Sequence, residues 1–168
     1  MFRINRKIDY AVRVLLALAR RPAGTRLSTG QIQAETRVPG PFLRRIVASL
    51  SQSDLIVTFS GPSGGLQLAR PAEAINLLHV WQAVEGELLI SDCLQQSEPG
   101  CPTPNAGLLG PLKACPLQPG CPVNRRWGRL QSLIVEELQA ATLAELAFQA
   151  DSLQAGSNPN FQALTTGD

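Results

Sequence analysis

The order of local signals in residues 6–70 constrains the fold most. Apolar residues recur at helical spacing over residues 6–19, which predicts an amphipathic helix. Ser28 is suited to cap a second helix that runs to Glu35. After a short turn, Pro41 suits the first position of a third helix, because a missing N–H costs nothing there. Two short helices joined by a tight turn predict a helix-turn-helix unit, whose second helix can enter the major groove of DNA.

The segment after the third helix predicts a β-hairpin. Residues 55–60 (LIVTFS) are rich in strand formers, residues 61–65 (GPSGG) are a strong turn signal, and residues 66–69 (LQLA) supply a second strand. A helix-turn-helix followed by a Gly-rich hairpin is typical of a winged helix. We therefore expect a mainly α fold with a small β-hairpin wing.

Charge is divided unevenly between the two parts of the chain. Residues 1–70 contain eleven Lys/Arg against three Asp/Glu, a formal charge of +8, whereas residues 71–168 contain four against ten, a charge of −6; together they give the net +2. A basic N-terminal part is the electrostatic footprint of phosphate-backbone binding. The alternative is a solvated basic face on a winged domain that contacts proteins, and the hairpin and charge together favour DNA.

These patterns predict which residues contact double-stranded operator DNA. Phosphate contacts are expected from the N-terminus, the start of the second helix and the wing, and major-groove contacts from the start of the third helix. The candidates are Arg3, Lys7, Ser28, Thr29, Pro41, Phe42, Arg44, Arg45, Ser60, Gly61, Ser63 and Gly64. Arg44 or Arg45 is the expected bidentate partner of a guanine.

All four cysteines lie in one Pro/Gly-rich stretch, at positions Cys93, Cys101, Cys115 and Cys121. Thiols crowded into one irregular segment indicate a metal or redox site. Thiolates are the usual ligands of iron–sulfur clusters and of structural zinc, and the absence of a Cys-x-x-Cys pair ranks zinc below a cluster. The alternatives are two disulfides, which a cytoplasmic protein disfavours, or four idle thiols, which the clustering disfavours.

Residues 123–140 predict a long helix with a wide apolar stripe. Val123, Trp127, Leu130, Ile134 and Leu138 recur at near-helical spacing. Such a helix needs a second partner beyond its own domain, and we expect a symmetric homodimer interface that matches a palindromic operator.

The chain divides into four predicted parts. Residues 1–86 form the winged helix-turn-helix domain, 87–122 the cysteine-bearing loop, 123–150 the dimerisation helix and a short final helix capped by Thr142, and 151–168 a disordered tail. No run of about 18 apolar residues predicts a membrane span, and no secretory signal is recognised. We therefore expect a cytoplasmic protein.

Several short motifs resemble the Rrf2 family of winged-helix transcription regulators. They are residues 9–11 (DYA), 61–65 (GPSGG), 80–86 (VWQAVEG), 92–93 (DC) and 142–146 (TLAEL), and the likeness runs from about residue 1 to residue 150. The family includes iron–sulfur cluster regulators, a nitric-oxide sensor and a regulator of cysteine metabolism. The resemblance implies a homodimeric, sequence-specific DNA-binding protein, often with an iron–sulfur cluster between the wing domain and a long dimerisation helix.

The resemblance also implies a ligand set for a two-iron or four-iron cluster. Three cysteines ligate the cluster in the family, and they match Cys93, Cys115 and Cys121. In one branch the fourth ligand is a histidine, where this chain has Asn124. In the nitric-oxide-sensing branch it is an acid from the first helix of the partner subunit, which matches Asp9; Cys101 is the other candidate. The single histidine, His79, lies on an apolar helical stretch and is expected to be a packed or surface residue.

Two wing positions depart from the family pattern. Ser60 stands where many members have an arginine, and Leu66 where a tyrosine is common. An arginine in a narrow minor groove reads sequence strongly. Without it, the backbone of residues 61–65 is the expected wing contact.

These observations predict a homodimeric DNA-binding transcription regulator that senses redox, iron or nitric-oxide status through an iron–sulfur cluster. One alternative is a cluster-free regulator that senses thiol oxidation. Another is an iron–sulfur electron-transfer protein, which would need neither the +8 charge nor the helix-turn-helix. An enzyme is not expected, because the chain has no Ser/His/Asp set and no Walker or dinucleotide loop.

Overall fold

The computed structural model describes residues 4–61, 64–91, 94 and 121–155. Its elements are α1 (Arg6–Ala19), α2 (Thr29–Thr36), α3 (Gly40–Gln52), β1 (Ile56–Phe59), β2 (Gly65–Leu68), the 3-10 helix η1 (Ala72–Ala74), α4 (Leu77–Glu85), α5 (Pro122–Ala140) and α6 (Leu143–Ala155). This order confirms the predicted mainly α fold with a small β-hairpin.

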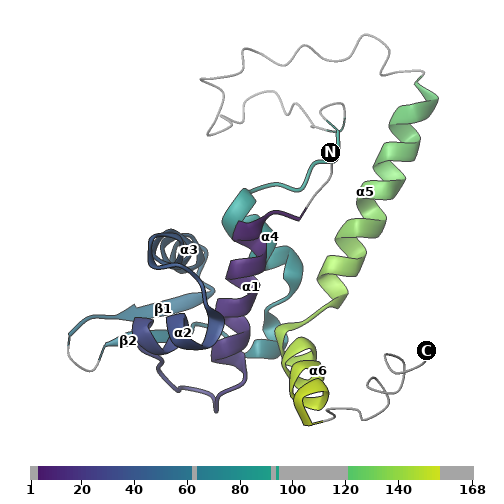
Figure 1. Ribbon diagram of the computed structural model, residues 1–168. Coiled ribbons are helices and arrows are strands. Elements are labelled where there is room, and N and C mark those ends of the chain that lie inside the picture. Colours follow the sequence, from purple (N-terminus) through teal and green to yellow (C-terminus); the bar gives the residue numbers. More distant parts are fainter. Residues whose placement is uncertain (1–3, 62–63, 92–93, 95–120, 156–168) are drawn as a thin grey trace, which may run out of the picture.

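Helix α1 is the central element, and α2, α3, α4 and α6 all pack against it (Figure 1). It begins where predicted because Asn5 caps it, its side-chain oxygen accepting from the backbone N–H groups of Lys7 (2.9 Å) and Ile8 (3.2 Å). Six of its apolar residues are buried: Ile8, Ala11, Val14, Leu15, Ala17 and Leu18. The domain is thus organised around a helix that does not itself belong to the helix-turn-helix.

Helices α2 and α3 form the predicted helix-turn-helix. Ser28 caps α2 in a reciprocal arrangement, in which its hydroxyl accepts from Gln31 N (3.2 Å) and Gln31 Oε1 accepts from Ser28 N (2.8 Å). Helix α3 begins at Gly40, so Pro41 occupies the second helical position and not the first. The prediction was wrong by one residue for a simple reason: all N–H groups of the first turn lack helical partners, so proline is tolerated at either position.

The hairpin pairs Ile56 with Leu68 and Phe59 with Gly65. A bridge from Leu27 extends it, since Leu27 N donates to Leu66 O (2.9 Å) and Leu66 N donates to Leu27 O (2.8 Å). Gly65 permits this approach, because a Cβ there would lie only 2.7 Å from Leu27 O. The hairpin is therefore tied directly to the segment that leads into α2.

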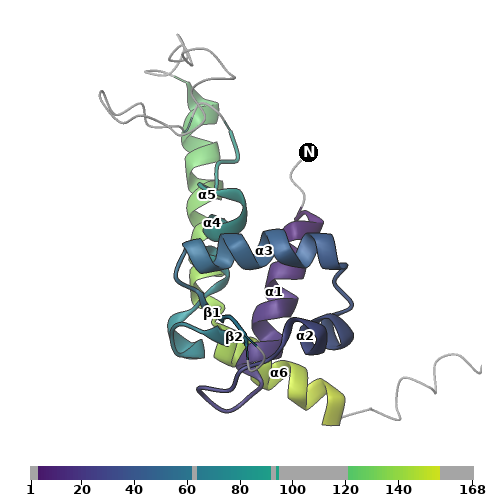
Figure 2. The ribbon, with the colours of Figure 1, turned by 90° about the vertical axis from the view of Figure 1, so that its left-hand side faces the viewer.

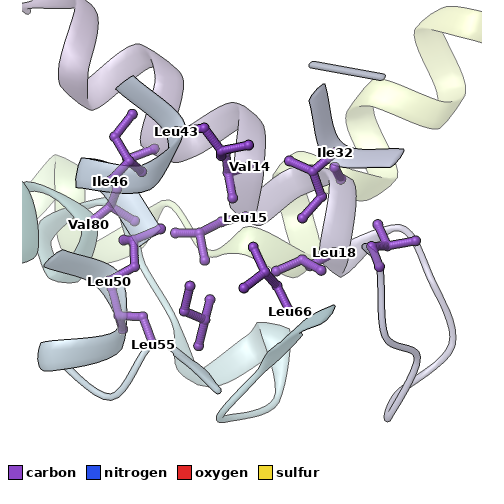
Figure 3. Close-up of a cluster of buried hydrophobic side chains, with 14 of the residues drawn as sticks. Val14, Leu15, Leu18, Ile32, Leu43, Ile46, Leu50, Leu55, Leu66 and Val80 are labelled. Atoms are coloured by element: carbon purple, nitrogen blue, oxygen red, sulfur yellow. The ribbon is translucent and has the colours of Figure 1, made fainter. Parts of the chain in front are cut away.

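The core gathers apolar side chains from every element of this domain (Figure 3). Figure 3 shows Val14, Leu15, Leu18, Ile32, Leu43, Ile46, Leu50, Leu55, Leu66 and Val80 converging between the helices and the hairpin. Burial of these side chains is the main source of stability. It also fixes α3 and the hairpin relative to each other.

Helix α5 runs beside α4, and its first turns project beyond the rest of the domain (Figures 1 and 2). Helix α6 continues to Ala155, past the predicted end at residue 150, so the predicted tail of residues 151–168 begins with helical residues. An ion pair between Arg20, at the C-cap of α1, and Asp151 (2.6 Å) contributes to this extension. No helix within the described ranges is long and apolar enough to cross a bilayer.

The junction of α5 and α6 is anchored to the N-terminal elements by a short bridge. Leu143 N donates to Ile75 O (2.8 Å), Leu77 N donates to Ala141 O (3.0 Å), and the Leu143 side chain is fully buried. We expect Leu143→Ala to lower the free energy of unfolding by about 2–5 kcal/mol, because it leaves a cavity. Urea unfolding measures this loss.

The control for that prediction is Leu153→Ala, the same truncation at a position of α6 that is 77% exposed. A change within about 0.5 kcal/mol is expected there. Equal urea midpoints for the wild type and Leu143→Ala would show that the bridge does not anchor the C-terminal helices.

Candidate nucleic-acid interface

Helices α2 and α3 and the hairpin share one side of the molecule, opposite the side that carries α5 (Figure 1). Figure 2 looks onto this side and shows α3 lying across α1, with α2 and the hairpin beside it. These are the elements that a winged helix uses on DNA. The predicted contact residues on them can therefore meet one ligand surface.

Helix α3 has one buried and one exposed face. Leu43, Ile46 and Leu50 are buried, whereas Arg44 and Arg45 are exposed. This division follows from helical periodicity, because the buried residues recur every three or four positions. The two guanidinium groups thus project from the helix on the side away from the core.

Phe42, in the first turn of α3, is 46% exposed although it is aromatic. The Tyr10 ring of α1 meets it edge-on, with a 5.9 Å separation of the ring centroids and an interplanar angle of 74°. An exposed apolar side chain at the start of a recognition helix is suited to contact a thymine methyl group. Pro41 beside it is also exposed.

Ion pairing divides the basic residues of this domain into two groups. The engaged cations are Lys7 with Glu85 (3.3 Å), Arg13 with Asp9 (2.9 Å), Arg20 with Asp151 (2.6 Å) and Arg21 with Glu35 (3.1 Å). Arg70 donates to the carbonyls of Ser53 and Asp54 at the end of α3. Among the described residues 4–70, five cations have no acidic partner: Arg6, Arg26, Arg37, Arg44 and Arg45. Four of these five lie in the helix-turn-helix or beside the hairpin.

The remaining predicted contact residues differ in whether their polar groups already have a hydrogen-bond or ion-pair partner within the protein. Thr29 is exposed at the start of α2, but the Ser28 hydroxyl already accepts the capping bond from Gln31. A phosphate would have to compete with Glu85 for Lys7. Arg3 lies outside the described residues.

The wing tip is compact. Ser60 and Gly61 are exposed, and Gly64 N donates to Gly61 O (2.9 Å). Gly61 has φ +99°, which favours glycine, and a Cβ on Gly64 would lie 2.5 Å from Phe59 O. The backbone is therefore the part of this turn best placed to approach a ligand; Ser63 lies outside the described residues.

Two further arginines on this side were not among the predicted contacts. Arg37, in the turn between α2 and α3, adopts the left-handed conformation with φ +57°. The Arg26 guanidinium carbon lies 3.6 Å from the centroid of the Phe59 ring. The +8 charge was the available sequence signal, but it does not reveal which cations remain unpaired or that Arg26 reaches a distant aromatic ring.

Of the predicted cluster ligands, Cys93, Cys101 and Cys115 lie outside the described residues. Cys121 is a free, half-buried thiol at the N-cap of α5, and its side chain makes no capping hydrogen bond. The described residues contain no group of three or more His, Cys, Asp or Glu side chains that would hold a metal. Cys121 is the member of the cysteine set that the structure describes, and a free thiol is the group that a cluster ligand must offer.

Asp9, the candidate fourth ligand, is occupied by another partner. Its carboxylate accepts from Arg13 one helical turn later at 2.9 Å, and about half of its side chain is exposed. Ligation through Oδ2 would therefore compete with Arg13, whereas ligation through Oδ1 would leave this ion pair in place. His79 has a local structural role, because its Nδ1 accepts from Asn76 N (3.3 Å) in the cap of α4.

Helix α5 exposes a row of large apolar side chains. Val123, Trp127, Leu130 and Leu133 are each between 42% and 53% exposed, and no residue of the helix is fully buried. An adjacent side of the helix meets the segment after α4, where Ile90 N donates to Gln131 Oε1 (3.3 Å). One face of α5 is therefore covered by its own chain and another is not.

Comparison with known proteins identifies relatives over most of the chain. A family model described as "Rrf2: Iron-dependent Transcriptional regulator" matches residues 4–149. The chain is 23% identical to the transcriptional regulator NsrR of Oceanobacillus iheyensis over 90% of its length and 94% of that protein. It is 34% identical to the helix-turn-helix type regulator Rv1287 of Mycobacterium tuberculosis, but the match covers 51% of this chain and about half (53%) of that relative. Among solved structures, CymR, the global cysteine regulator of Bacillus subtilis, superposes with a TM-score of 0.66 at 21% identity, covering 89% of this chain and 98% of that one.

Proposed function

Because the chain belongs to the Rrf2 family of iron-dependent transcriptional regulators, we propose that it is a homodimeric, sequence-specific DNA-binding regulator that senses redox, iron or nitric-oxide status through an iron–sulfur cluster. It would act in the cytoplasm on double-stranded operator DNA. The family is one of regulators and not of enzymes.

One observation carries the DNA-binding part of the proposal: four of the five unpaired cations described within residues 4–70 lie on or beside the elements that a winged helix places on DNA. Arg44 and Arg45 are exposed on α3, and Arg37 lies in the turn before it. Arginines that already have a carboxylate partner, such as Arg13 and Arg21, lie on α1 and in the loop after it. This segregation supports a specific phosphate-binding surface over a generally solvated basic face.

The exposed apolar face of α5 supports the homodimer. Trp127 and Leu130 present large apolar areas to solvent in a single chain, which is costly unless a second surface covers them. A second copy of α5 would bury both faces symmetrically. Two recognition helices related by a two-fold axis would then match a palindromic operator.

The cysteine set supports the cluster. Cys93, Cys115 and Cys121 would supply three thiolates, with Cys101 or the Asp9 carboxylate of the partner subunit as the fourth ligand. A bound cluster supplies redox chemistry and reactivity toward oxidants and nitric oxide. Cys121 contributes a free thiol at the N-cap of α5, so ligation there would constrain the start of that helix.

A chain of contacts links Asp9 to the recognition helix. Arg13, the partner of Asp9, also lies over the Tyr10 ring, with its guanidinium carbon 5.8 Å from the ring centroid. Tyr10 in turn packs edge-on against Phe42 at the start of α3. Any change that draws the Asp9 carboxylate away from Arg13 therefore alters the support of a predicted base-contacting residue. Regulation requires that the two resulting states differ in operator affinity.

A cluster-free regulator that senses thiol oxidation is the second candidate. It is supported by the reduced, half-buried thiol of Cys121 and by the position of Cys115 six residues earlier in a Pro/Gly-rich segment. The fold likeness to the cysteine regulator CymR agrees with either candidate. Counting iron and sulfide in the purified protein separates the two.

Selection of duplexes from a random-sequence library tests the DNA-binding proposal. The full chain, purified without oxygen, is expected to enrich a palindromic site with two half-sites about one helical turn apart. Its affinity for that site should exceed that for random duplex by roughly a thousandfold or more. Failure to enrich any sequence, with no binding at low salt, would contradict the proposal.

A further inference from the structure

Arg26 makes a contact that the proposed function has not used. Its guanidinium carbon lies 3.6 Å from the centroid of the Phe59 ring, which is stacking distance, and the residue is exposed to solvent. No acidic side chain within the described ranges pairs with it. The stack covers one face of the planar group and leaves its N–H edges available.

The backbone places this pair near the outer end of the hairpin. Phe59 is the last residue of β1 and pairs with Gly65, the first residue of β2. Arg26 directly precedes Leu27, which bridges to Leu66. The guanidinium is therefore held beside the wing turn and two residues before the cap of α2 at Ser28.

Stacking on Phe59 orients the guanidinium before any ligand arrives. A free arginine side chain loses rotamer freedom when it binds, whereas a side chain already held against a ring loses less. Arg26 also lines an open depression together with Thr25 and Gln31 and with the Arg21–Glu35 ion pair. The Glu35 carboxylate in this depression is neutralised by Arg21, so a ligand oxygen would meet a preoriented Arg26 that has no carboxylate partner of its own to release.

We propose that Arg26, positioned by Phe59, donates to a backbone phosphate of the DNA that the wing approaches. The proposal rests on the proposed DNA-binding function. It supplies a side-chain cation to a wing that has Ser60 directly before the turn. Because the guanidinium stacks on Phe59 at the end of β1 and is not part of the turn itself, it is placed to donate to the DNA backbone beside the wing.

The test measures DNA binding of Arg26→Ala at several salt concentrations. The probes are the duplex selected by the wild type and a random duplex of the same length. A lost phosphate contact is expected to weaken binding about tenfold on both, and to reduce the slope of log affinity against log salt by about 1. The control is Arg125→Ala, which removes the same charge from an exposed arginine in the first turn of α5, and which should leave the slope unchanged.

Substitutions at Phe59 test the positioning role. Phe59→Tyr keeps the aromatic face and should retain wild-type affinity, whereas Phe59→Leu removes it and should weaken binding part of the way toward Arg26→Ala. In the Arg26→Ala background, Phe59→Leu should have no further effect on affinity. Arg26→Lys keeps the charge but loses the planar stack, and should fall between wild type and Arg26→Ala.

Three results would overturn the proposal. The first is an Arg26→Ala protein with wild-type affinity and salt slope. The second is a loss confined to duplexes with A·T-rich flanks, which would make Arg26 a reader of the minor groove. The third is an additive effect of Phe59→Leu on Arg26→Ala. If the wild type binds no duplex at all, the proposed function itself fails, which is a distinct outcome.

Discussion

Replacing Arg44 and Arg45 together with alanine is expected to weaken operator binding by about 2–4 kcal/mol, or roughly thirty- to a thousandfold. Both side chains are exposed on α3, and neither has an acidic partner among the described residues. One bidentate contact to a guanine contributes about 1–3 kcal/mol of discrimination, and a phosphate contact adds a smaller, sequence-independent amount. A titration of the selected duplex with the variant measures the loss.

The control removes the same charge from another exposed Arg–Arg pair. Arg125 and Arg126 are both exposed in the first turns of α5, far from α3. Their double alanine variant is expected to bind within about threefold of the wild type, since only long-range electrostatics change. If the Arg44→Ala, Arg45→Ala double variant keeps the wild-type affinity for the selected duplex and the same base preference, α3 is not the recognition helix.

Introducing two glutamates into the exposed face of α5 is expected to have an even larger effect. Trp127→Glu combined with Leu130→Glu places two like charges on each copy of a symmetric interface, where they meet again across the two-fold axis. We expect a monomer in sedimentation experiments. Loss of the second subunit's helix-turn-helix should lower operator affinity by roughly a hundred- to ten-thousandfold, because two linked DNA-binding units bind far more tightly than one.

The matched control for the dimer variant is Ser132→Glu. At about 100° per residue, Ser132 lies on the opposite side of α5 from Trp127 and Leu130, and it is also exposed. It should leave the dimer and its DNA affinity intact. Circular dichroism checks that the double variant keeps its helices. A double variant that remains a dimer with wild-type affinity would show that another surface joins the subunits.

The elements of the DNA-binding domain were predictable because their signals are local. Ser28 marks the start of α2 by its own capping chemistry, and the apolar period of residues 6–19 marks α1. The glycines of the wing turn mark the hairpin in the same way. The one-residue error at Pro41 arose because the first-turn positions of a helix are chemically similar.

What could not be predicted depends on contacts between distant parts of the chain. The extension of α6 to Ala155 involves the pairing of Asp151 with Arg20, and the Lys7–Glu85 pair likewise joins α1 to the end of α4. Nothing in the sequence around these four charged residues indicates which of them will pair. The stacking of Arg26 on Phe59 was missed for the same reason, although it changes which cation is available to DNA.

The cysteine set shows the reverse situation. Its four members were conspicuous in the sequence because they share one short stretch. The structure describes Cys121 alone among them, as a free thiol at the start of α5. The ligand set therefore stays a prediction, supported by thiol chemistry and by membership of an iron-dependent family.

We propose that these cysteines hold an iron–sulfur cluster whose presence changes the affinity of the dimer for DNA. The most direct test of this proposal uses one batch of protein purified without oxygen. Iron, acid-labile sulfide and visible absorption are determined, and affinity for the selected duplex is measured before and after the cluster is removed. The account predicts a coloured dimer with comparable amounts of iron and sulfide, and an affinity that changes about 5- to 150-fold on cluster loss while the dimer persists. A colourless, iron-free dimer that binds the duplex tightly would contradict it and favour the thiol switch.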